Sequence, residues 1–241
     1  MSKKRKTTTK KVKRRRLKPK AAVFLLCFFG GLFLIIFYFT KTNVTHVYVE
    51  GNDYLSVSYI LKKSGLEKDI KFSEATQLRI CKKLKDPLIN TCKVKHHLNR
   101  SITVVITENK PLFFYTNENK LALSSGELLE AENTYGVPTL INYVPKKVLK
   151  KFITGLAGTN SDIIRSISEI EYSPSQNSDG TYIDEGRFLL SMNDSNTVYI
   201  NIKHIDVLNY YEKVYASLGD KRGTYYFDCD FDNYYFEEYG K

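Results

Sequence analysis

The first forty residues contain no aspartate or glutamate. Between Lys3 and Lys20 twelve residues are Lys or Arg, so this segment carries +12 in a chain whose formal net charge is +11. A segment so basic and so poor in apolar side chains cannot bury enough surface to fold, and we expect residues 1–20 to form a disordered tail. Without those twelve residues, 25 of the 37 basic residues remain against 26 acidic ones, so the rest of the chain is close to neutral.

Residues 21–40, "AAVFLLCFFGGLFLIIFYFT", lack every charged side chain. Twenty residues of α-helix span about 30 Å, the thickness of the hydrocarbon core of a bilayer, so a transmembrane helix is predicted. The positive-inside rule keeps the basic tail in the cytoplasm and places residues 41–241 outside, a single-pass type II topology. A cleaved signal peptide is disfavoured because "FYFTKTNV" offers no small-x-small cleavage site. Orientation and attraction to anionic lipid explain the tail, so nucleic acid is not expected as a partner.

Motifs of catalysis and cofactor binding are also missing. There is no CxxC, no Cys/His ligand spacing, no GxSxG and no Gly-rich nucleotide loop, and the four histidines show no ligand spacing. Asp228, Asp230 and Asp232 alternate, but the glycine and distal glutamate of an EF-type loop are absent, which favours a solvated strand face. We therefore expect no enzyme activity, no cofactor, no metal and no small-molecule substrate.

The four cysteines divide into Cys27 in the apolar run and three, an odd number, beyond it. Cys81 lies on a predicted helix and Cys92 on the following predicted strand, both at apolar positions. A disulfide between them is conceivable in an oxidising exterior. Two separate small hydrophobic side chains in the core is the favoured interpretation.

Residues 44–108 contain the pattern strand, helix, helix, strand, strand. Val44–Glu50 alternates and ends at the turn pair Gly51-Asn52. A helix capped by Ser56 or Ser58 runs to Ser64-Gly65, and a second is predicted from Ser73 through Ala75, Leu78, Cys81 and Leu84 to the break at Asp86-Pro87. Two strands in "LINTCKVKHHL" and "SITVVITE" are joined by a turn at Asn99-Arg100. Two helices should cover one face of a three-stranded sheet.

These residues resemble a known domain. "VYVEGNDYLSVSYILKKSGL" resembles the opening of a POTRA domain, and "LKDPLINTCKVKHHLNRSITVVITENKP" resembles its close. The residues that carry the motif are Val49, Gly51, Asn52, Pro87, Glu108 and Pro111. His96 stands where Arg is usual and Asn99 where Pro is usual. With a basic tail and one span before it, the arrangement is similar to the FtsQ/DivIB family of bitopic bacterial cell-division proteins.

The resemblance implies an α+β chain: tail 1–20, transmembrane helix 21–40, POTRA domain 41–111, a mixed β domain with flanking helices over 112–230, and a C-terminal tail 231–241. It implies a non-enzymatic scaffold at the division septum of the bacterial cell membrane. Its partners would be small bitopic division proteins of the FtsL and DivIC/FtsB type. A membrane-anchored cell-wall enzyme and a POTRA-type secretion chaperone are the alternatives.

The residues after Pro111 independently indicate a β domain. Short strands are predicted in "PLFFYTNENKLALSSGELLE", helices over 148–152, 160–167 and 205–218, a hairpin over 187–202, and a mobile loop over Ser173–Gly186.

The last nineteen residues, Gly223–Lys241, include eight aromatic and five acidic side chains. We predict Gly223–Asp230 to be the outer strand, with Tyr226 and Phe227 on opposite faces. Tyrosine is enriched in protein interfaces, so a partner-binding surface is predicted at Tyr225, Tyr226, Tyr234, Tyr235 and Phe236. Burial in the β core is an equally weighted interpretation of this segment, above all for Tyr225 and Phe227.

Overall fold

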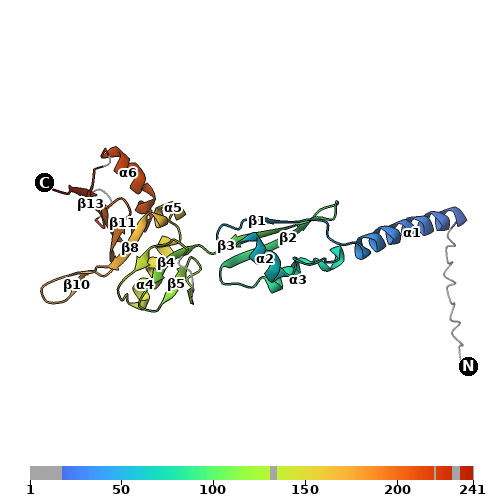
Figure 1. Ribbon diagram of the computed structural model, residues 1–241, viewed down its shortest axis with the longest axis horizontal. Helices are drawn as coiled ribbons and strands as arrows, with labels where there is room; N and C mark the ends of the chain where they lie inside the picture. Colours follow the sequence, from blue (N-terminus) through green and yellow to red (C-terminus); the bar gives the residue numbers. More distant parts are fainter. Residues whose placement is uncertain (1–17, 131–134, 220, 230–233, 241) are drawn as a thin grey trace, which may run out of the picture.

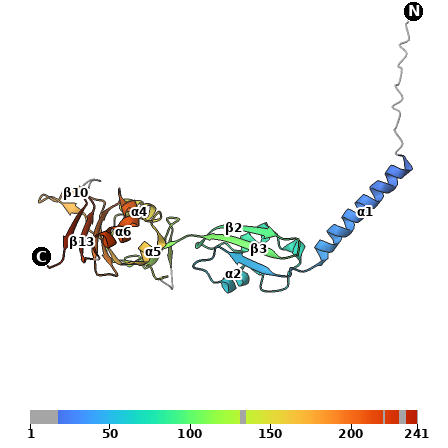
Figure 2. The same ribbon diagram turned by 90° about the horizontal axis from the view of Figure 1, so that it is seen from above.

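The computed structural model describes residues 18–130, 135–219, 221–229 and 234–240 (Figure 1). Three parts follow one another along the long axis: a projecting helix, a small α/β domain and a larger domain built on a broad sheet (Figures 1 and 2). Most of the predicted tail, residues 1–17, lies outside the described residues, as do positions 230–233.

Helix α1, Pro19–Lys41, extends the predicted span by two residues at its start and one at its end. Proline is accommodated in the first turn because its missing N–H would have no partner there. None of its residues is buried, and in the described part of the chain it is the one helix long and apolar enough to cross a membrane.

The small domain has the predicted βααββ order. Its elements are β1 (Val47–Glu50), α2 (Val57–Ser64), the 3-10 turn η1 (Phe72–Glu74), α3 (Gln77–Lys83), β2 (Ile89–His96) and β3 (Ile102–Glu108). The sheet order is β1-β3-β2, with β1 parallel and β2 antiparallel to the central β3. Ile102, Val104 and Ile106 alternate onto the face that packs against Ile60 and Ile80 of the helices.

The helix boundaries follow local capping. The Ser56 hydroxyl accepts a hydrogen bond from the Tyr59 N–H at 3.2 Å, and Gly65 ends α2 in the left-handed region at φ 75°. The second helix differs from the prediction, because residues from Phe72 form only a 3-10 turn and α3 restarts at Gln77 behind the cap Thr76. This break rotates Leu78 out of the core, and 82% of the Leu78 surface is exposed to solvent.

The large domain contains a nine-stranded sheet of order β14-β13-β12-β11-β8-β7-β4-β5-β6. Its strands are β4 (Pro111–Tyr115), β5 (Lys120–Leu123), β6 (Leu128–Glu130), β7 (Thr139–Leu140), β8 (Ile167–Tyr172), β11 (Arg187–Met192), β12 (Thr197–Asn201), β13 (Gly223–Phe227) and β14 (Tyr235–Glu238). Helices α4 (Lys146–Leu156), α5 (Ser161–Arg165) and α6 (Tyr211–Ser217) and the 3-10 helix η2 (Ile205–Tyr210) contribute to its core. Phe152 of α4 stacks on Phe188 of β11 at 3.9 Å between ring centres.

Three predicted elements need correction. The helix expected over 160–167 ends at Arg165, and Ile167 begins β8, which pairs with β7 and β11 in the middle of the sheet. The helix expected over 205–218 is divided into η2 and α6. The loop Ser173–Gly186 contains a small hairpin of β9 (Ser175–Gln176) and β10 (Tyr182–Asp184).

Candidate partner-binding site at the C-terminal sheet edge

The outer strand of the large sheet is β14. The prediction that residues 223–230 form the edge is wrong, because β14 pairs antiparallel with the outer side of β13. In this pairing Gly223 lies opposite Glu238, and Tyr226 lies opposite Tyr235. Gly223 permits this pairing, since an added Cβ would lie 2.1 Å from the Glu237 carbonyl oxygen and 2.6 Å from the Phe236 ring. β14 ends the order of the described strands, so its outer side has no neighbour among them.

One face of this edge carries a row of tyrosines on three adjacent strands. Tyr199 of β12 lies in register with Tyr226 of β13, which lies in register with Tyr235 of β14. The ring centres are 5.2 Å apart in the first pair and 5.5 Å apart in the second. Tyr235 is 57% exposed, whereas Tyr199 and Tyr226 are half-buried by their neighbours. We call these three residues the tyrosine row.

Charged groups hold the inner end of the row. The Arg187 guanidinium lies 3.7 Å from the centre of the Tyr199 ring and its Nε donates to Asp228 at 2.6 Å. The Tyr226 hydroxyl donates to the Glu237 carboxylate at 3.2 Å. The pKa of Tyr226 is raised above its ordinary value. Partial burial is the larger cause, and this hydrogen bond to an anion is the second. The row is therefore positioned by its own strand neighbours.

The opposite face of the same strands belongs to the core. Tyr225 is fully buried, and Phe227 is 2% exposed. Phe236 is half-buried, with its ring centre 4.8 Å from that of Tyr225. Tyr234, 39% exposed, lies edge-on to Phe227 at 5.4 Å. Strand alternation thus separates the aromatic side chains of this segment into a set that packs on the core and a set on the opposite face of the sheet.

The predicted set of five is therefore divided. Tyr225 is a core residue and not a surface anchor, and Phe236 chiefly covers it; Tyr226, Tyr234 and Tyr235 retain accessible surface. Sequence reasoning missed Tyr199 and Arg187, which complete the row. Their signal was alternation, because each stands beside a core residue of the predicted hairpin and so points to the other face.

The POTRA motif residues have structural roles. The Glu108 carboxylate accepts hydrogen bonds from the backbone N–H groups of Asp53, Tyr54 and Leu55 at 3.0, 2.6 and 3.0 Å. Gly51 has φ 81°, and an added Cβ would lie 2.1 Å from the Ile106 carbonyl oxygen.

Two of the remaining motif residues secure turns, and a third begins a strand. The Asn52 amide donates to the Leu55 carbonyl at 3.0 Å, the Pro87 carbonyl accepts from the Asn109 amide at 2.6 Å, and Pro111 begins β4. Val49 packs against the small-domain core. The motif therefore closes the small domain where it meets the large one.

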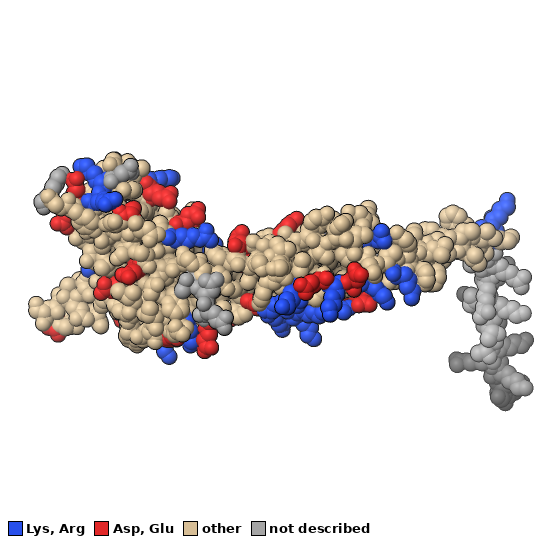
Figure 3. Space-filling view, viewed as in Figure 1, with Lys and Arg blue, Asp and Glu red and all other residues tan. Residues whose placement is uncertain are grey.

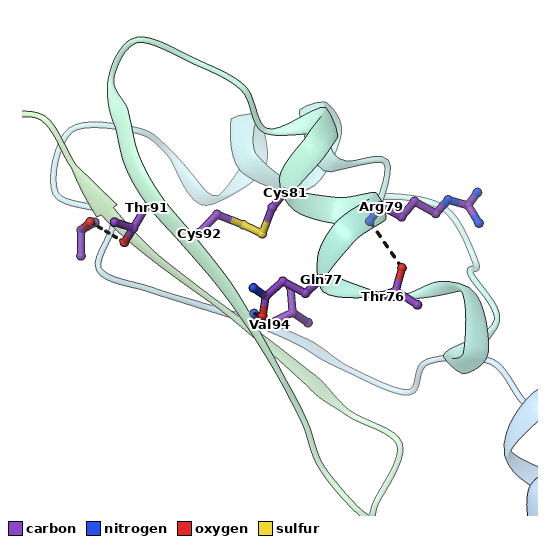
Figure 4. Close-up of a disulfide and its surroundings, with 8 residues drawn as sticks. Thr76, Gln77, Arg79, Cys81, Thr91, Cys92 and Val94 are labelled. Carbon is purple, nitrogen blue, oxygen red and sulfur yellow. Dashed lines mark hydrogen bonds between the residues drawn. A yellow bond between two sulfur atoms is a disulfide. The ribbon is translucent and has the colours of Figure 1, made fainter.

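Cys81 of α3 and Cys92 of β2 form a disulfide with Cα atoms 5.6 Å apart (Figure 4). The favoured interpretation of two separate cysteines is wrong here, because helical packing brings α3 onto β2. Figure 4 shows the bond joining helix and strand above the sheet. Among the described residues, Cys27 and Cys229 are not part of a disulfide.

Charge differs between the two domains. Residues 41–111 contain 13 Lys and Arg against 7 Asp and Glu, whereas residues 112–241 contain 12 against 19. Figure 3 shows Lys and Arg gathered over the helical side of the small domain, where Lys62, Lys68, Lys71, Arg79 and Lys83 line a recess of about 570 Å³. The tyrosine row thus lies in the acidic domain.

Within residues 18–130, 135–219, 221–229 and 234–240 no three His, Cys, Asp or Glu side chains could hold a metal ion. Of the three alternating aspartates, Asp228 pairs with Arg187, and Asp230 and Asp232 lie outside the described residues.

Comparison with known proteins finds matches to the small domain and to most of the chain. Residues 42–109 match the family model "POTRA domain, FtsQ-type". The cell division protein DivIB of Bacillus subtilis is 27% identical over 218 residues, covering 86% of this chain and 80% of that protein. DivIB of Bacillus anthracis is 28% identical over 179 residues, covering 72% and 65%. The solved extracytoplasmic domain of DivIB from Geobacillus stearothermophilus aligns with 47% of this chain and 97% of that chain, at 23% identity and a TM-score of 0.37.

An FtsQ-type POTRA match directly after the apolar helix α1, together with DivIB relatives that align across most of the chain, is the arrangement that the resemblance to the FtsQ/DivIB family implies.

Proposed function

We propose that this chain is a non-enzymatic scaffold of the division septum, and that it binds a strand-forming segment of another membrane-anchored division protein at the β14 edge. The observation that carries the proposal is the tyrosine row, which runs to an outer strand with no neighbouring strand among the described residues. Small bitopic proteins of the FtsL and DivIC/FtsB type are the proposed partners, on the strength of the family resemblance.

The proposed mode is strand addition. Main-chain hydrogen bonds to β14 would supply much of the affinity, and the tyrosines would select side chains on alternate positions of the partner. Tyr235 offers a large, rigid ring at low entropic cost, and the ring is already aligned by Tyr226. The acidic composition of the domain would steer a basic segment towards the edge.

The register of β14 indicates which backbone groups face outward. The Tyr239 N–H donates to the Arg222 carbonyl at 3.0 Å, so the alternation of an antiparallel ladder directs the Phe236 N–H and C=O away from β13. These groups are where an added strand would attach.

A pair of substitutions at Phe236 tests this mode. Phe236→Ala removes the ring but keeps the N–H, whereas Phe236→Pro also removes the outward donor. Calorimetric titration with a co-purified partner should show weaker binding by Phe236→Pro than by Phe236→Ala, beyond any difference in their melting. Equal affinities of the two variants would contradict strand addition at this edge.

The proposed location is the cell membrane at the septum, with the basic tail in the cytoplasm and both domains outside. A reporter that is active only outside the cell, fused after the last residue, should give signal. Moving the twelve basic residues to the other end of α1 should weaken or invert that signal, and an unchanged signal would show that the tail does not set the topology.

A further inference from the structure

The tip of the β2–β3 hairpin, residues 97–100, lies beside the end of the apolar helix α1. The Arg100 guanidinium is 5.7 Å from the centre of the Tyr38 ring. The Thr45 N–H donates to the Arg100 carbonyl at 3.1 Å, and the Thr45 hydroxyl donates to the Asn99 carbonyl at 3.0 Å. Figure 1 shows this hairpin extending from the sheet towards α1. The tip is therefore tied to the segment that leaves the helix.

A second segment of the small domain fixes the same end of α1. The Phe72 ring of η1 lies 5.7 Å from that of Phe39, and the Phe72 N–H donates to the Thr42 carbonyl at 2.9 Å. The Ser73 hydroxyl donates to the Thr40 carbonyl at 3.2 Å. Contacts through both η1 and the hairpin tip hold the domain at a defined level along α1.

That level coincides with the expected membrane interface. The 23 residues of α1 span about 35 Å, which exceeds the roughly 30 Å hydrocarbon core, so the last turn with Tyr38 belongs among the headgroups. Leu98 at the hairpin tip is 94% exposed, more than any other large apolar residue outside α1 in the described chain. Lys41 and Arg100 flank this level with positive charge, and Lys41 lies over the Phe37 ring at 5.8 Å.

We propose that residues 97–100 form a second membrane contact, in which Leu98 inserts at the boundary between headgroups and acyl chains while Arg100 and Lys41 face lipid phosphates. The exposed leucine, the flanking cations and the continuity with the span all fit one occupant, the anionic bilayer surface. With α1 as the first attachment, a second contact fixes the tilt and rotation of the domain over the membrane. The inference depends on α1 spanning a bilayer and is independent of binding at β14.

The sequence contains no tryptophan, so Leu98→Trp places a single tryptophan at the tip, whose emission is excited selectively at wavelengths that tyrosine does not absorb. The full chain carrying it is reconstituted into phosphatidylcholine vesicles that contain phosphatidylglycerol, with and without bromine on the upper acyl carbons. Tryptophan favours the membrane interface, so its emission should move to shorter wavelength and be quenched about twofold or more by the brominated lipid. Emission typical of water that bromine does not quench would overturn the proposal.

The matched control is Ile183→Trp, on the β10 hairpin at the far end of the molecule from α1 (Figure 1), where the native side chain is 65% exposed. It should remain unquenched, and equal quenching of both variants would mean that the protein adsorbs without a defined tip contact. Brominated vesicles of phosphatidylcholine without phosphatidylglycerol should quench the tryptophan of Leu98→Trp less. Equal quenching with and without the anionic lipid would overturn the role given to Arg100 and Lys41.

Discussion

Glu108, at the end of β3, accepts a hydrogen bond from the backbone N–H of Tyr54 at 2.6 Å across 54 residues of sequence. Two further N–H groups, of Asp53 and Leu55, complete the ring of donors around the same carboxylate. One acidic side chain thus orders the loop between β1 and α2, in the manner of an anion held by successive backbone amides.

Glu108→Gln should destabilise the small domain by about 2 kcal/mol. The hydrogen bonds to the side chain would lose their charge, and the NH2 group of the glutamine would face a backbone N–H, a donor against a donor. Denaturant unfolding of the outer region measures this. Glu50→Gln is the control, since Glu50 is largely exposed and its ion pair with Lys95 is 3.8 Å long, so a change within about 0.5 kcal/mol is expected. Equal losses for the two variants would refute the role of Glu108.

The acid-side stability of the small domain should depend on Asp86. It pairs with Lys63, and it accepts from the Tyr59 hydroxyl at 2.6 Å and the Leu88 N–H at 3.0 Å. Burial opposes ionisation, but these bonds together outweigh it and lower the pKa of Asp86 below its ordinary value. Since the folded pKa is the lower one, the contribution is complete above the unfolded value of about 3.9 and is lost as pH falls further.

Melting as a function of pH tests this. Asp86→Asn should be less stable than the parent near neutral pH, and the difference should shrink below about pH 4. Tyr59→Phe removes one of the bonds and should show a smaller version of the same change. A difference between parent and Asp86→Asn that stays constant with pH would contradict the assignment.

The disulfide should stabilise the small domain by about 3 kcal/mol, the chain-entropy estimate for a loop of this size, as the two cysteines are 11 residues apart. Cys81→Ala combined with Cys92→Ala, or reduction of the parent protein, should lower the unfolding midpoint. Cys229→Ala is the control because Cys229 is not part of a disulfide among the described residues. A parent protein whose unfolding is unchanged by reductant would contradict the estimate.

The sequence predicted the small domain well because its signals are local. Caps, turn glycines and alternation each fix one element, and together they define the βααββ order. The prediction failed where tertiary packing determines the local structure. The expected helix is interrupted after η1, whose Phe72 packs against Phe39 of α1, and Leu78 consequently lies outside the core. The pairing of Cys81 with Cys92 likewise depends on how α3 lies on the sheet.

The site was half predictable. The aromatic richness of the C-terminal segment marked the correct part of the chain, and alternation placed Tyr226 and Phe227 on opposite faces. The order of strands could not be inferred, so β14 was missed as the edge, and Tyr199 could not be joined to a residue 27 positions later in the register of β12 and β13. A row across strands exists only once the sheet is assembled.

Substitutions on the two faces of β13 and β14 should separate binding from stability. Tyr235→Ala and Tyr226→Ala should each weaken the complex by about 2 kcal/mol, the loss typical of truncated aromatic anchors. Phe227→Ala should instead cost about 3 to 5 kcal/mol of folding stability as a buried aromatic. Calorimetry with the co-purified partner and thermal melts give the two readouts. Binding by the folded fraction of Phe227→Ala that is weaker than that of Tyr235→Ala would reverse the assignment of the faces.

Deleting residues 233–241 should weaken both folding and partner binding. The sequence predicts only a C-terminal tail over 231–241, but β14 pairs with β13, and the ring centre of Phe236 lies 4.8 Å from that of Tyr225. Removing β14 exposes the buried Tyr225 and leaves β13 as a new sheet edge. The loss in folding stability measured by melting should therefore exceed the roughly 0.5 kcal/mol typical of surface changes. Truncation after Tyr239 keeps all of β14 and serves as the control. If the nine-residue deletion melted like that control, β14 would contribute nothing to the domain, and the partner edge would have to be sought at β13.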